Sequence, residues 1–445
     1  MGSDPVWRLL FRFSGPAIVS MTVASTYNLV DAVFVGRLGA AALAAMSVTY
    51  PLVLSFIALA SGTAVGATSL ISRSLGKGDR KNGDRAACVA ITLCFLLSGM
   101  IALTCLPNLE ALLRLLGAGD AVLRPAREYL SILIYGIVFS NLSMIMSSII
   151  RADGNPVFSS SVGISSSIIN IILDPVFIFG LGPIPAMGIS GAAIATVLAQ
   201  VVSVAVYLIY IVSGRTEYRF RPGHFIPRPR VVAGIYRIGM ASIVRSGVQF
   251  LVMGVVNRTA ATFGVTALAI VGVLVRAGRF VQMPTLGLGQ GMIPLVGYNH
   301  GARKKERVAE LVFKAALAGI VWTGLCWMIL MLFPGRVMSA FNAEPAFLQE
   351  GTPAVRMYFM FIFVLGLQMV PGFFFQAIGR GLPAVILSSA RHVFFLLPMV
   401  LLLPRLYGPT GLWVSFPIAD ALALILAIFW IAFEFRRQEI SFPGR

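Results

Sequence analysis

Three acidic side chains, Asp31, Asp174 and Asp420, lie within long apolar stretches, whereas most other acidic residues lie in polar connections or near the ends of such stretches. An ionised carboxylate in the middle of a lipid-spanning helix costs about 2.5–3.5 kcal/mol on insertion scales. Such a residue is therefore a functional candidate by default, as an ion ligand, a proton carrier or a partner of a buried cation.

Asp174 ends a polar stripe on an expected helix, in which polar or small residues recur at three- and four-residue steps and so share one face. The stripe consists of Ser159, Gly163, Ser166, Asn170 and Asp174. Pro175 cannot donate a hydrogen bond to the carbonyl of Ile171, which frees an oxygen near the carboxylate. A carboxylate, an amide oxygen and a free carbonyl suit a hard cation or an exchangeable proton. The alternative is that Asp174 pairs with an interior arginine and holds helices together.

Asp31 lies on the first apolar stretch. Helical spacing places Ser20, Tyr27 and Asp31 on one face, which we expect to point into a helix bundle. The alternative is a packing role, in which the carboxylate makes one hydrogen bond to Tyr27 or Asn28.

The second half of the chain carries cations in its apolar stretches. These are Arg245, Arg276, Arg279 and Arg391, accompanied by Gln249, Gln282, Gln368 and His392. Arg276 and Arg279 are three residues apart and hence neighbours on a helix. The candidates for substrate contact are Arg245, Gln249, Arg276, Arg279, Gln282 and Asp420. The alternative is that Arg276 and Arg279 neutralise Asp420 or other carboxylates; a lone His392 is more often a hydrogen-bonded core residue than a proton relay.

The elements that position these side chains are membrane helices. Of the 445 residues 58% are hydrophobic and 12% charged, with a mean hydropathy of +0.88. Apolar runs of about 20 residues recur, each long enough to cross the hydrocarbon core as a helix, whereas no stretch keeps the alternation of a β-barrel strand. We predict an all-α polytopic membrane protein with about twelve spans at 11–37, 44–72, 86–106, 128–150, 157–179, 188–212, 234–258, 266–294, 309–332, 354–379, 384–403 and 409–433.

The net charge of +18 is concentrated in alternate connections, which indicates topology. The basic groups are Arg8 and Arg12 before the first span; Arg73, Lys77, Arg80, Lys81 and Arg85 after the second; Arg215, Arg219, Arg221, Arg228, Arg230 and Arg237 around the central connection; Arg303, Lys304, Lys305 and Arg307 after the eighth; and Arg436, Arg437 and Arg445 at the end. The positive-inside rule places both termini in the cytoplasm, in a multi-pass inner-membrane protein that contacts anionic lipid. No compact basic fold is available for nucleic acid.

Other functional classes lack the residues they need. Cys88, Cys94, Cys105 and Cys326 lie in or at the ends of spans without metal-site spacing, which favours packing roles. An intramembrane enzyme needs a nucleophile and base or a metal cluster in the spans, but His224, His300 and His392 are scattered. Nothing indicates the symmetric filter of a channel. We expect neither catalysis nor a cofactor.

The two halves resemble each other. A shift of 225 residues aligns Gly39 with Gly264, Gly62 with Gly287, Gly66 with Gly291, Gly76 with Gly301, and Gly154 with Gly379. After a five-residue slip, Gly188 and Gly191 match Gly408 and Gly411. Six helices in each half would insert in the same orientation, as in parallel-repeat carriers. The polar, Pro-rich connection at about 213–231 would let two bundles move.

Several motifs together resemble the multidrug and toxic compound extrusion (MATE) family over nearly the whole chain. They are YNLVD at 27–31 with VGRLG at 35–39, NIILDPVFIF at 170–179, GAAIAT at 191–196 and QGMIPLVGYNHGA at 290–302. The resemblance is greatest to the DinF-like branch.

This resemblance implies two six-helix lobes in a V, an N-lobe at 1–212 and a C-lobe at 232–445 joined by a cytoplasmic linker at 213–231. It implies a monomeric secondary antiporter that exports drugs, toxins or metabolites in exchange for protons or sodium. The cation site, or a sodium site, would consist of Asp31, Asn170, Asp174, Thr196 and Tyr129. Other branches carry acidic residues where this chain has Arg245, Arg276 and Arg279. The resemblance therefore argues against a sodium site in the C-lobe, and the arginines suggest anionic or zwitterionic substrates. The alternative is a flippase for a lipid-linked precursor in the same superfamily.

Overall fold

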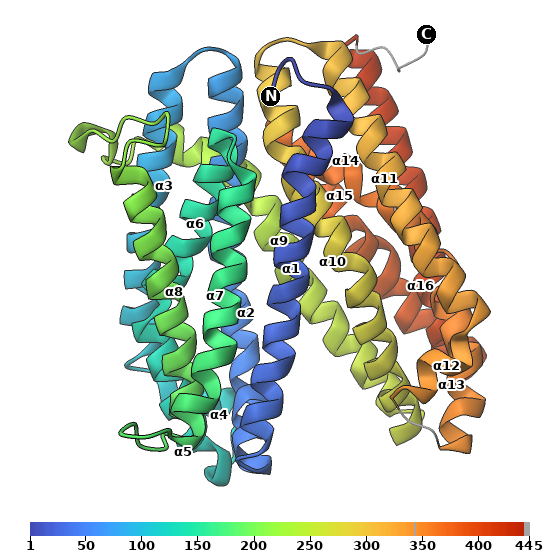
Figure 1. Ribbon diagram of the computed structural model, residues 1–445. Coiled ribbons are helices and arrows are strands. Elements are labelled where there is room, and N and C mark those ends of the chain that lie inside the picture. Colours follow the sequence, from blue (N-terminus) through green and yellow to red (C-terminus); the bar gives the residue numbers. More distant parts are fainter. Residues whose placement is uncertain (342–343, 440–445) are drawn as a thin grey trace. The chain divides into compact units, whose positions relative to one another are not determined.

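The computed structural model describes residues 1–341 and 344–439, and these residues form helices joined by short connections (Figure 1). The C-terminal segment 440–445, with the predicted cytoplasmic Arg445, lies outside the described residues. The helices of the first half are α1 (Val6–Gly36), α2 (Ala40–Gly76), α3 (Arg80–Cys105), α4 (Leu109–Leu115), α5 (Asp120–Tyr135), α6 (Ile137–Asp153), α7 (Pro156–Phe179) and α8 (Ile189–Val212).

The second half follows after a short 3₁₀ turn, η1 (Pro222–His224). Its helices are α9 (Pro229–Ala261), α10 (Val265–Gly301), α11 (Lys305–Leu332), α12 (Pro334–Ser339), α13 (Pro345–Tyr358), η2 (Ile362–Val364), α14 (Leu365–Ile378), α15 (Gly381–Ala390), η3 (Arg391–Leu396) and α16 (Leu397–Arg437).

The predicted spans correspond to these helices. Nine described helices are long and apolar enough to cross a membrane by themselves, and two bent pairs bring the number to eleven. The last of them, Gly381–Arg437, has a non-helical residue at Gly408 (φ 60°, ψ −144°) between the two spans predicted there. Divided at Gly408, the described helices give the twelve spans expected from the sequence.

Two spans that the hydropathy pattern predicts as single helices are broken. The span predicted at 128–150 consists of α5 and α6, which meet at 48°, and the span at 354–379 consists of α13 with η2 and α14, bent by 41°. At the first break, a side chain on Gly136 would collide with Val197 of α8. At this break α8 therefore packs directly against the backbone of Gly136, a contact that hydropathy alone does not predict.

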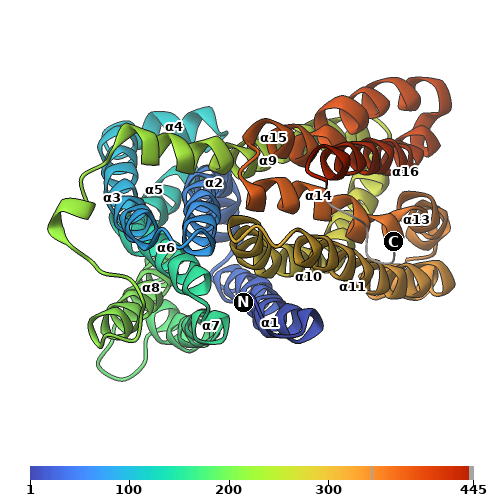
Figure 2. The same cartoon turned by 90° about the horizontal axis from the view of Figure 1, so that it is seen from above.

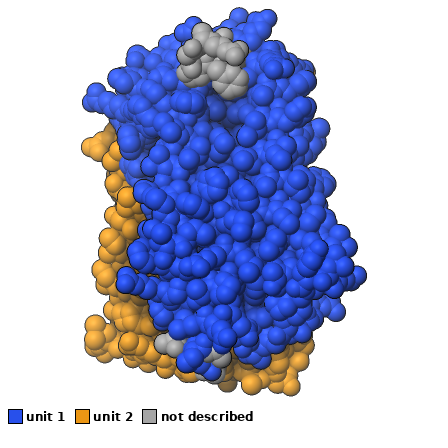
Figure 3. Space-filling model, turned by 90° about the vertical axis from the view of Figure 1, so that its right-hand side faces the viewer, with its two compact units in different colours: residues 1–18, 240–445 blue, residues 19–239 orange. Residues whose placement is uncertain are grey.

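The chain packs as two compact units, coloured separately in Figure 3. Unit 2 contains residues 19–239, and unit 1 contains residues 1–18 and 240–445. α1 and α9 thus each begin in one unit and continue in the other. The division predicted from the sequence, into 1–212 and 232–445 with a linker at 213–231, stays a prediction.

Glycines allow the first parts of α1 and α9 to pack closely within the unit in which each helix begins. In unit 2, α9 approaches α2 so closely that a side chain on Gly66 would collide with the Ile235 carbonyl. In unit 1, α1 approaches α10 in the same way, and a side chain on Gly291 would collide with Ser14. Gly66 and Gly291 are the pair that the 225-residue shift aligns, so both halves use the same device for close helix approach.

The repeat predicted from the sequence extends to the helix boundaries. Each second-half start lies 225 residues after its counterpart in the pairs α2 and α10, α3 and α11, α4 and α12, α5 and α13, α6 and η2, and α7 and α15. The special glycines repeat as well: Gly39 and Gly264 have φ of 114° and 107°, and Gly154 and Gly379 have φ of 105° and 87°. Both conformations are ones that L side chains rarely adopt.

Within each unit, equivalent helices pack side by side (Figure 2). α2, α3 and α6 contact one another in unit 2, and α10, α11 and α14 contact one another in unit 1. The loop before α7 shows how the sequence sets this up. Gly154 ends α6 in a left-handed conformation, and the Asn155 side chain accepts a hydrogen bond from Phe158 N (3.2 Å) and caps α7, which begins at Pro156.

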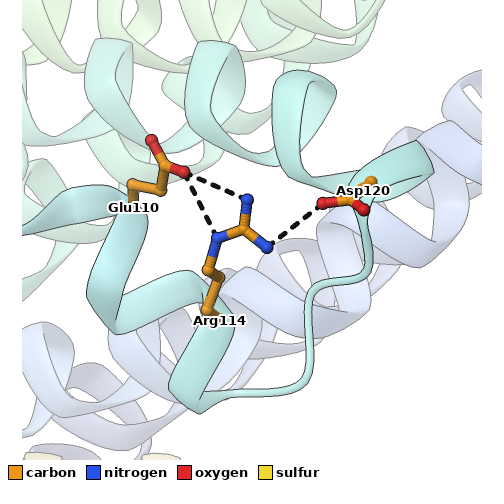
Figure 4. A network of polar contacts seen from close by, with 3 residues as sticks. All are labelled: Glu110, Arg114 and Asp120. Carbon is orange, nitrogen blue, oxygen red and sulfur yellow. Dashed lines mark hydrogen bonds and ion pairs between the residues drawn. The ribbon is translucent and has the colours of Figure 1, made fainter.

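An exposed polar network fixes the turn between α4 and α5 (Figure 4). The Arg114 guanidinium donates to Glu110 Oε1 (3.2 Å) and, through Nη1, to Asp120 Oδ1 (3.1 Å). These carboxylates raise the pKa of Arg114, which keeps its charge in any case. Because all three groups are exposed, the network positions the turn and adds little to stability.

The central connection is not the free tether that its composition suggests. Tyr218 is buried and donates to the Ile149 carbonyl (3.1 Å), and Glu217 N donates to Asp153 Oδ2 (3.3 Å). Thr92 of α3 donates to the Phe225 carbonyl (2.8 Å). Residues 217–225 therefore dock on α3 and α6 of unit 2, because the aromatic side chains of the connection join its apolar core.

Candidate cation-binding site

The five residues proposed as a cation site come from four helices of unit 2. α1 carries Asp31, α5 carries Tyr129, α7 carries Asn170 and Asp174, and α8 carries Thr196. Four of the five side chains are buried: Asp31 is 5% exposed, Asp174 0%, Asn170 2% and Tyr129 8%. The structure thus buries both carboxylates inside one helix bundle.

Asn170 links the two helices that face each other across the site. Its Nδ2 donates to Asp174 Oδ1 at 3.2 Å, one helical turn further along α7, and lies 3.4 Å from Thr196 Oγ1 on α8. The side-chain amide therefore connects the carboxylate on α7 with the hydroxyl on α8. Oxygens of these three types are the ligands that hard cations prefer.

Three buried oxygens at the site have no hydrogen-bond partner: Asp31 Oδ1, Asp174 Oδ2 and Asn170 Oδ1. Buried polar atoms are normally paired, because leaving one unpaired costs about 1–3 kcal/mol. None of the ion pairs among residues 1–341 and 344–439 includes Asp31 or Asp174. The structural alternative, in which Asp174 pairs with an interior arginine, does not describe this arrangement.

The acidic groups interact electrostatically. Asp31 acts on Asp174, and both carboxylates act on the Tyr129 hydroxyl together with Tyr27. Two enclosed carboxylates that repel each other are stabilised by any positive charge that enters between them. The arrangement can therefore take up a proton or a small cation.

The polar stripe of α7 faces the bundle interior, as its spacing predicts. Ser166 Oγ donates to the Ala199 carbonyl of α8 (3.1 Å), and Ser159 Oγ donates to the Ser147 carbonyl of α6 (2.8 Å). A side chain on Gly163 would contact Ser20 Oγ of α1 at 2.9 Å. The stripe is thus the surface on which α1, α6 and α8 meet α7, and it carries Asp174 at its end.

The residues proposed for substrate contact differ in how deeply they are buried. Asp420 is buried and forms an ion pair with Arg391, whereas Arg276 and Arg279 are exposed in this structure. The half-buried ones are Arg245, Gln249 and Gln282. The arginine that neutralises Asp420 is therefore Arg391, and not Arg276 or Arg279 as the alternative predicted.

Sequence reasoning missed a second polar cluster in unit 2. Arg151 Nη2 donates to Ser147 Oγ (3.2 Å), which is 2.7 Å from Ser159 Oγ, and the Tyr207 hydroxyl donates to the Ser159 carbonyl (2.9 Å). Arg151 lies in the last turn of α6. The four-residue spacing from Ser147 was the available signal, because it places both side chains on one helical face.

The pattern of matches to known proteins covers both halves of the chain. A model of the MatE family matches residues 16–176 and 238–401. The chain belongs to the MatE family. It is therefore a multi-pass membrane protein of a transporter family rather than of an enzyme family, and the matched segments fall on the two repeats described above.

Relatives and solved structures of the MatE family agree over almost the full length. The chain is 26% identical over 437 residues to the multidrug export protein MepA of Staphylococcus haemolyticus, covering 97% of this chain and 94% of the relative. It is 25% identical over 427 residues to MepA of Staphylococcus aureus, with 96% and 93% covered.

Two solved structures illustrate the fold. An outward-facing multidrug resistance MATE family transporter of the MOP superfamily is 26% identical, with a TM-score of 0.91 and 99% and 100% of the two chains covered. A MOP superfamily transporter from Pyrococcus furiosus, described as having a binding pocket of reverse polarity that suggests a different function, is 25% identical, with a TM-score of 0.90 and the same coverage.

Proposed function

We propose that this MatE-family chain is a secondary active antiporter that exports small organic compounds, such as drugs, toxins or metabolites, in exchange for protons or sodium ions. The relatives named as multidrug export proteins support the substrate class. The coupling rests on the site in unit 2. We further propose that the chain belongs to the DinF-like branch and works as a monomer in the cytoplasmic (inner) membrane with both termini inside.

One observation carries the coupling proposal: Asp31 and Asp174 are buried, close enough to interact, and outside every ion pair among the described residues. A buried carboxylate without a cationic partner is unfavourable unless an exchangeable positive charge occupies the site for part of the time. Asn170, Thr196 and Tyr129 supply further oxygens for that charge.

The cycle that we propose is alternating access. A proton or sodium ion that enters from outside neutralises the Asp31 and Asp174 pair, changes how α1 packs on α7, and favours release of the exported compound. Loss of the ion to the cytoplasm resets the site. Ion and compound shift the equilibrium only through their different affinities for the two conformations, so they must compete or couple through a shared preference.

The test is dye efflux from vesicles that contain the purified full-length chain, driven by an imposed proton or sodium gradient. We expect Asp31→Asn and Asp174→Asn each to lower gradient-driven efflux by about tenfold or more, because each removes one charge that the ion must neutralise. The matched control is Asp120→Asn, an exposed carboxylate outside the site (Figure 4). Efflux that is unchanged in both site variants would refute the coupling role.

A flippase for a lipid-linked precursor is the alternative that the sequence leaves open. Such a protein would be expected to carry helices beyond twelve and a strongly cationic cavity. The described helices account for twelve spans, and the relatives carry multidrug export names, so export of small compounds is the better supported function.

A further inference from the structure

Unit 1 contains a buried charged cluster at the junction of α9, η3 and α16. Asp420 of α16 has a side chain that is 4% exposed, and its Oδ1 accepts a hydrogen bond from Arg391 Nε. His392, which is 8% exposed, lies within electrostatic range of both Arg391 and Arg245. The cluster thus combines two guanidinium groups and an imidazole with one carboxylate.

The charges of this cluster do not balance. Asp420 neutralises Arg391, but none of the ion pairs in the described part of the chain (1–341 and 344–439) includes Arg245. The Arg245 guanidinium lies 3.5 Å from Ser242 Oγ on its own helix and 5.9 Å above the Phe373 ring. A guanidinium carries five N–H donors, so most of its donors have no protein acceptor among these contacts.

The backbone at this cluster is unusual. Arg391–Leu396 form a π-helical turn between α15 and α16. Such turns are rare and are frequently found at functional sites. Here the turn begins at the residue that binds Asp420, and the next residue, His392, leaves its buried Nδ1 without a partner. Two independent features, an unbalanced charge and a rare turn, therefore coincide.

An arginine inside a membrane bundle without a counter-charge is unfavourable by several kcal/mol, and an anion that approaches it removes that penalty. A guanidinium matches a carboxylate geometrically, through two parallel N–H···O bonds. We propose that Arg245, supported by Arg391 and His392, binds a carboxylate group of the exported compound. The proposal rests on the export function and adds the substrate class: organic anions, or zwitterions that present a carboxylate.

The role of each residue follows from its contacts. Arg245 is the contact residue, because its donors are available. Arg391 is held by Asp420 and adds positive potential, and Asp420 keeps Arg391 in place. Phe373 attracts the Arg245 guanidinium by a cation–π contact, which uses none of its N–H donors as a hydrogen bond to a protein oxygen. The site in unit 2 binds the driving cation, so the two units take charges of opposite sign.

The test measures equilibrium binding to the purified full-length chain in nanodiscs without any ion gradient. The probes share a xanthene skeleton: fluorescein carries a carboxylate and is anionic, whereas rhodamine 6G is an ester and is cationic. We expect Arg245→Gln to weaken fluorescein binding by about tenfold or more, the loss of one charge-assisted hydrogen-bonded contact, and to leave rhodamine 6G binding nearly unchanged. Arg245→Lys should fall between, because it keeps the charge and loses the planar fork.

The matched control is Arg258→Gln, which removes an exposed arginine from the last turn of the same helix and should change neither dye. Thermal unfolding of each variant shows whether it is folded. Fluorescein binding that is unaffected by Arg245→Gln in folded protein would overturn the proposal, and so would an equal loss of both dyes. No gradient is applied in this binding measurement. Its result therefore does not depend on whether the Asp31 and Asp174 variants lose ion-coupled efflux.

Discussion

At the scale of single residues, the same side chain type serves two different purposes. Asp420 is neutralised by Arg391, whereas Asp31 and Asp174 each keep a buried oxygen without a partner. A paired carboxylate is fixed in charge, while an unpaired one changes its charge with whatever enters the site. The difference assigns Asp420 to the structure of unit 1, and we propose ion exchange for the other two.

Thr196 provides a finer test of the cation site. Thr196→Val keeps the shape of the side chain but removes the oxygen that lies 3.4 Å from Asn170 Nδ2. We expect the cation concentration for half-maximal efflux to rise roughly threefold to tenfold, since one oxygen ligand is worth about one hydrogen bond. Efflux assayed at varied sodium concentration and pH measures this shift. Ser203→Ala on the same helix, whose hydroxyl bonds only locally to Ala199, should behave as wild type.

At the scale of helices, glycines determine how closely neighbouring elements approach. A side chain on Gly191 at the start of α8 would collide with the Phe177 carbonyl of α7, and one on Gly411 would collide with the Leu403 carbonyl. Each of these glycines lies three residues after another glycine with φ near 60°, which is Gly188 for Gly191 and Gly408 for Gly411. The same turn therefore closes the helix pair that ends each half.

These two glycines allow a matched stability experiment. Gly191→Ala and Gly411→Ala should each lower the free energy of unfolding by about 1–3 kcal/mol, because backbone must move to admit a methyl group. Gly99→Ala in α3 has nothing within 4 Å and should be neutral or slightly stabilising. Thermal unfolding of the purified variants in detergent shows their order of stability. Equal stabilities of all three variants would contradict close packing at these turns.

The docked connection gives a second prediction at this scale. Burial raises the pKa of Tyr218, so its phenol stays a donor to the Ile149 carbonyl at neutral pH. This contribution is present below the ordinary tyrosine value, about pH 10, and is lost as the pH rises through the raised pKa. Tyr218→Phe should loosen the connection by about 1 kcal/mol.

Trypsin cleavage after Arg219, which is followed by Phe220, reports on that loosening, because a protease acts on the opened segment. We expect cleavage of folded Tyr218→Phe to be about fivefold faster than in wild type, as a change of 1 kcal/mol implies. Tyr135→Phe, an exposed tyrosine at the end of α5, is the control. A cleavage rate equal to that of wild type would indicate that the connection is not held by this contact.

At the scale of the whole molecule, charge and repeat agree on one topology. Helices that begin 225 residues apart follow each other in both halves, which favours insertion of both halves in the same direction. Basic residues follow α2 and α10 at equivalent places, including Arg80 and Lys305. We therefore propose that these two connections lie in the cytoplasm, together with the docked connection 217–225.

Cysteine labelling tests this orientation. With Cys88, Cys94, Cys105 and Cys326 replaced by serine, we introduce Lys81→Cys at the start of α3 and Ala121→Cys after its other end. In intact cells a membrane-impermeant maleimide should label position 121 but not position 81, and it should label both after permeabilisation. Labelling of position 81 in intact cells would reverse the proposed orientation.

The sequence by itself determined the positions of the spans, the glycine-marked repeat and the polar face of α7. These features are local, because a span needs only enough apolar residues, and a helical face needs only the right spacing. Asp174 was identifiable for the same reason, since a carboxylate in an apolar helix is conspicuous without any knowledge of its neighbours. Membership of the MatE family, expected from the motifs, is confirmed.

Only the tertiary structure decided which side chains are partners. Asn170 bridges Asp174 and Thr196, Arg391 rather than Arg276 or Arg279 pairs with Asp420, and the polar connection docks through Tyr218. Apart from the Asn170–Asp174 contact within α7, each of these contacts joins different helices or segments, and it depends on how the helices rotate and bend. Hydropathy measures how apolar a segment is, but it contains no information on the azimuth at which the segment meets its neighbours.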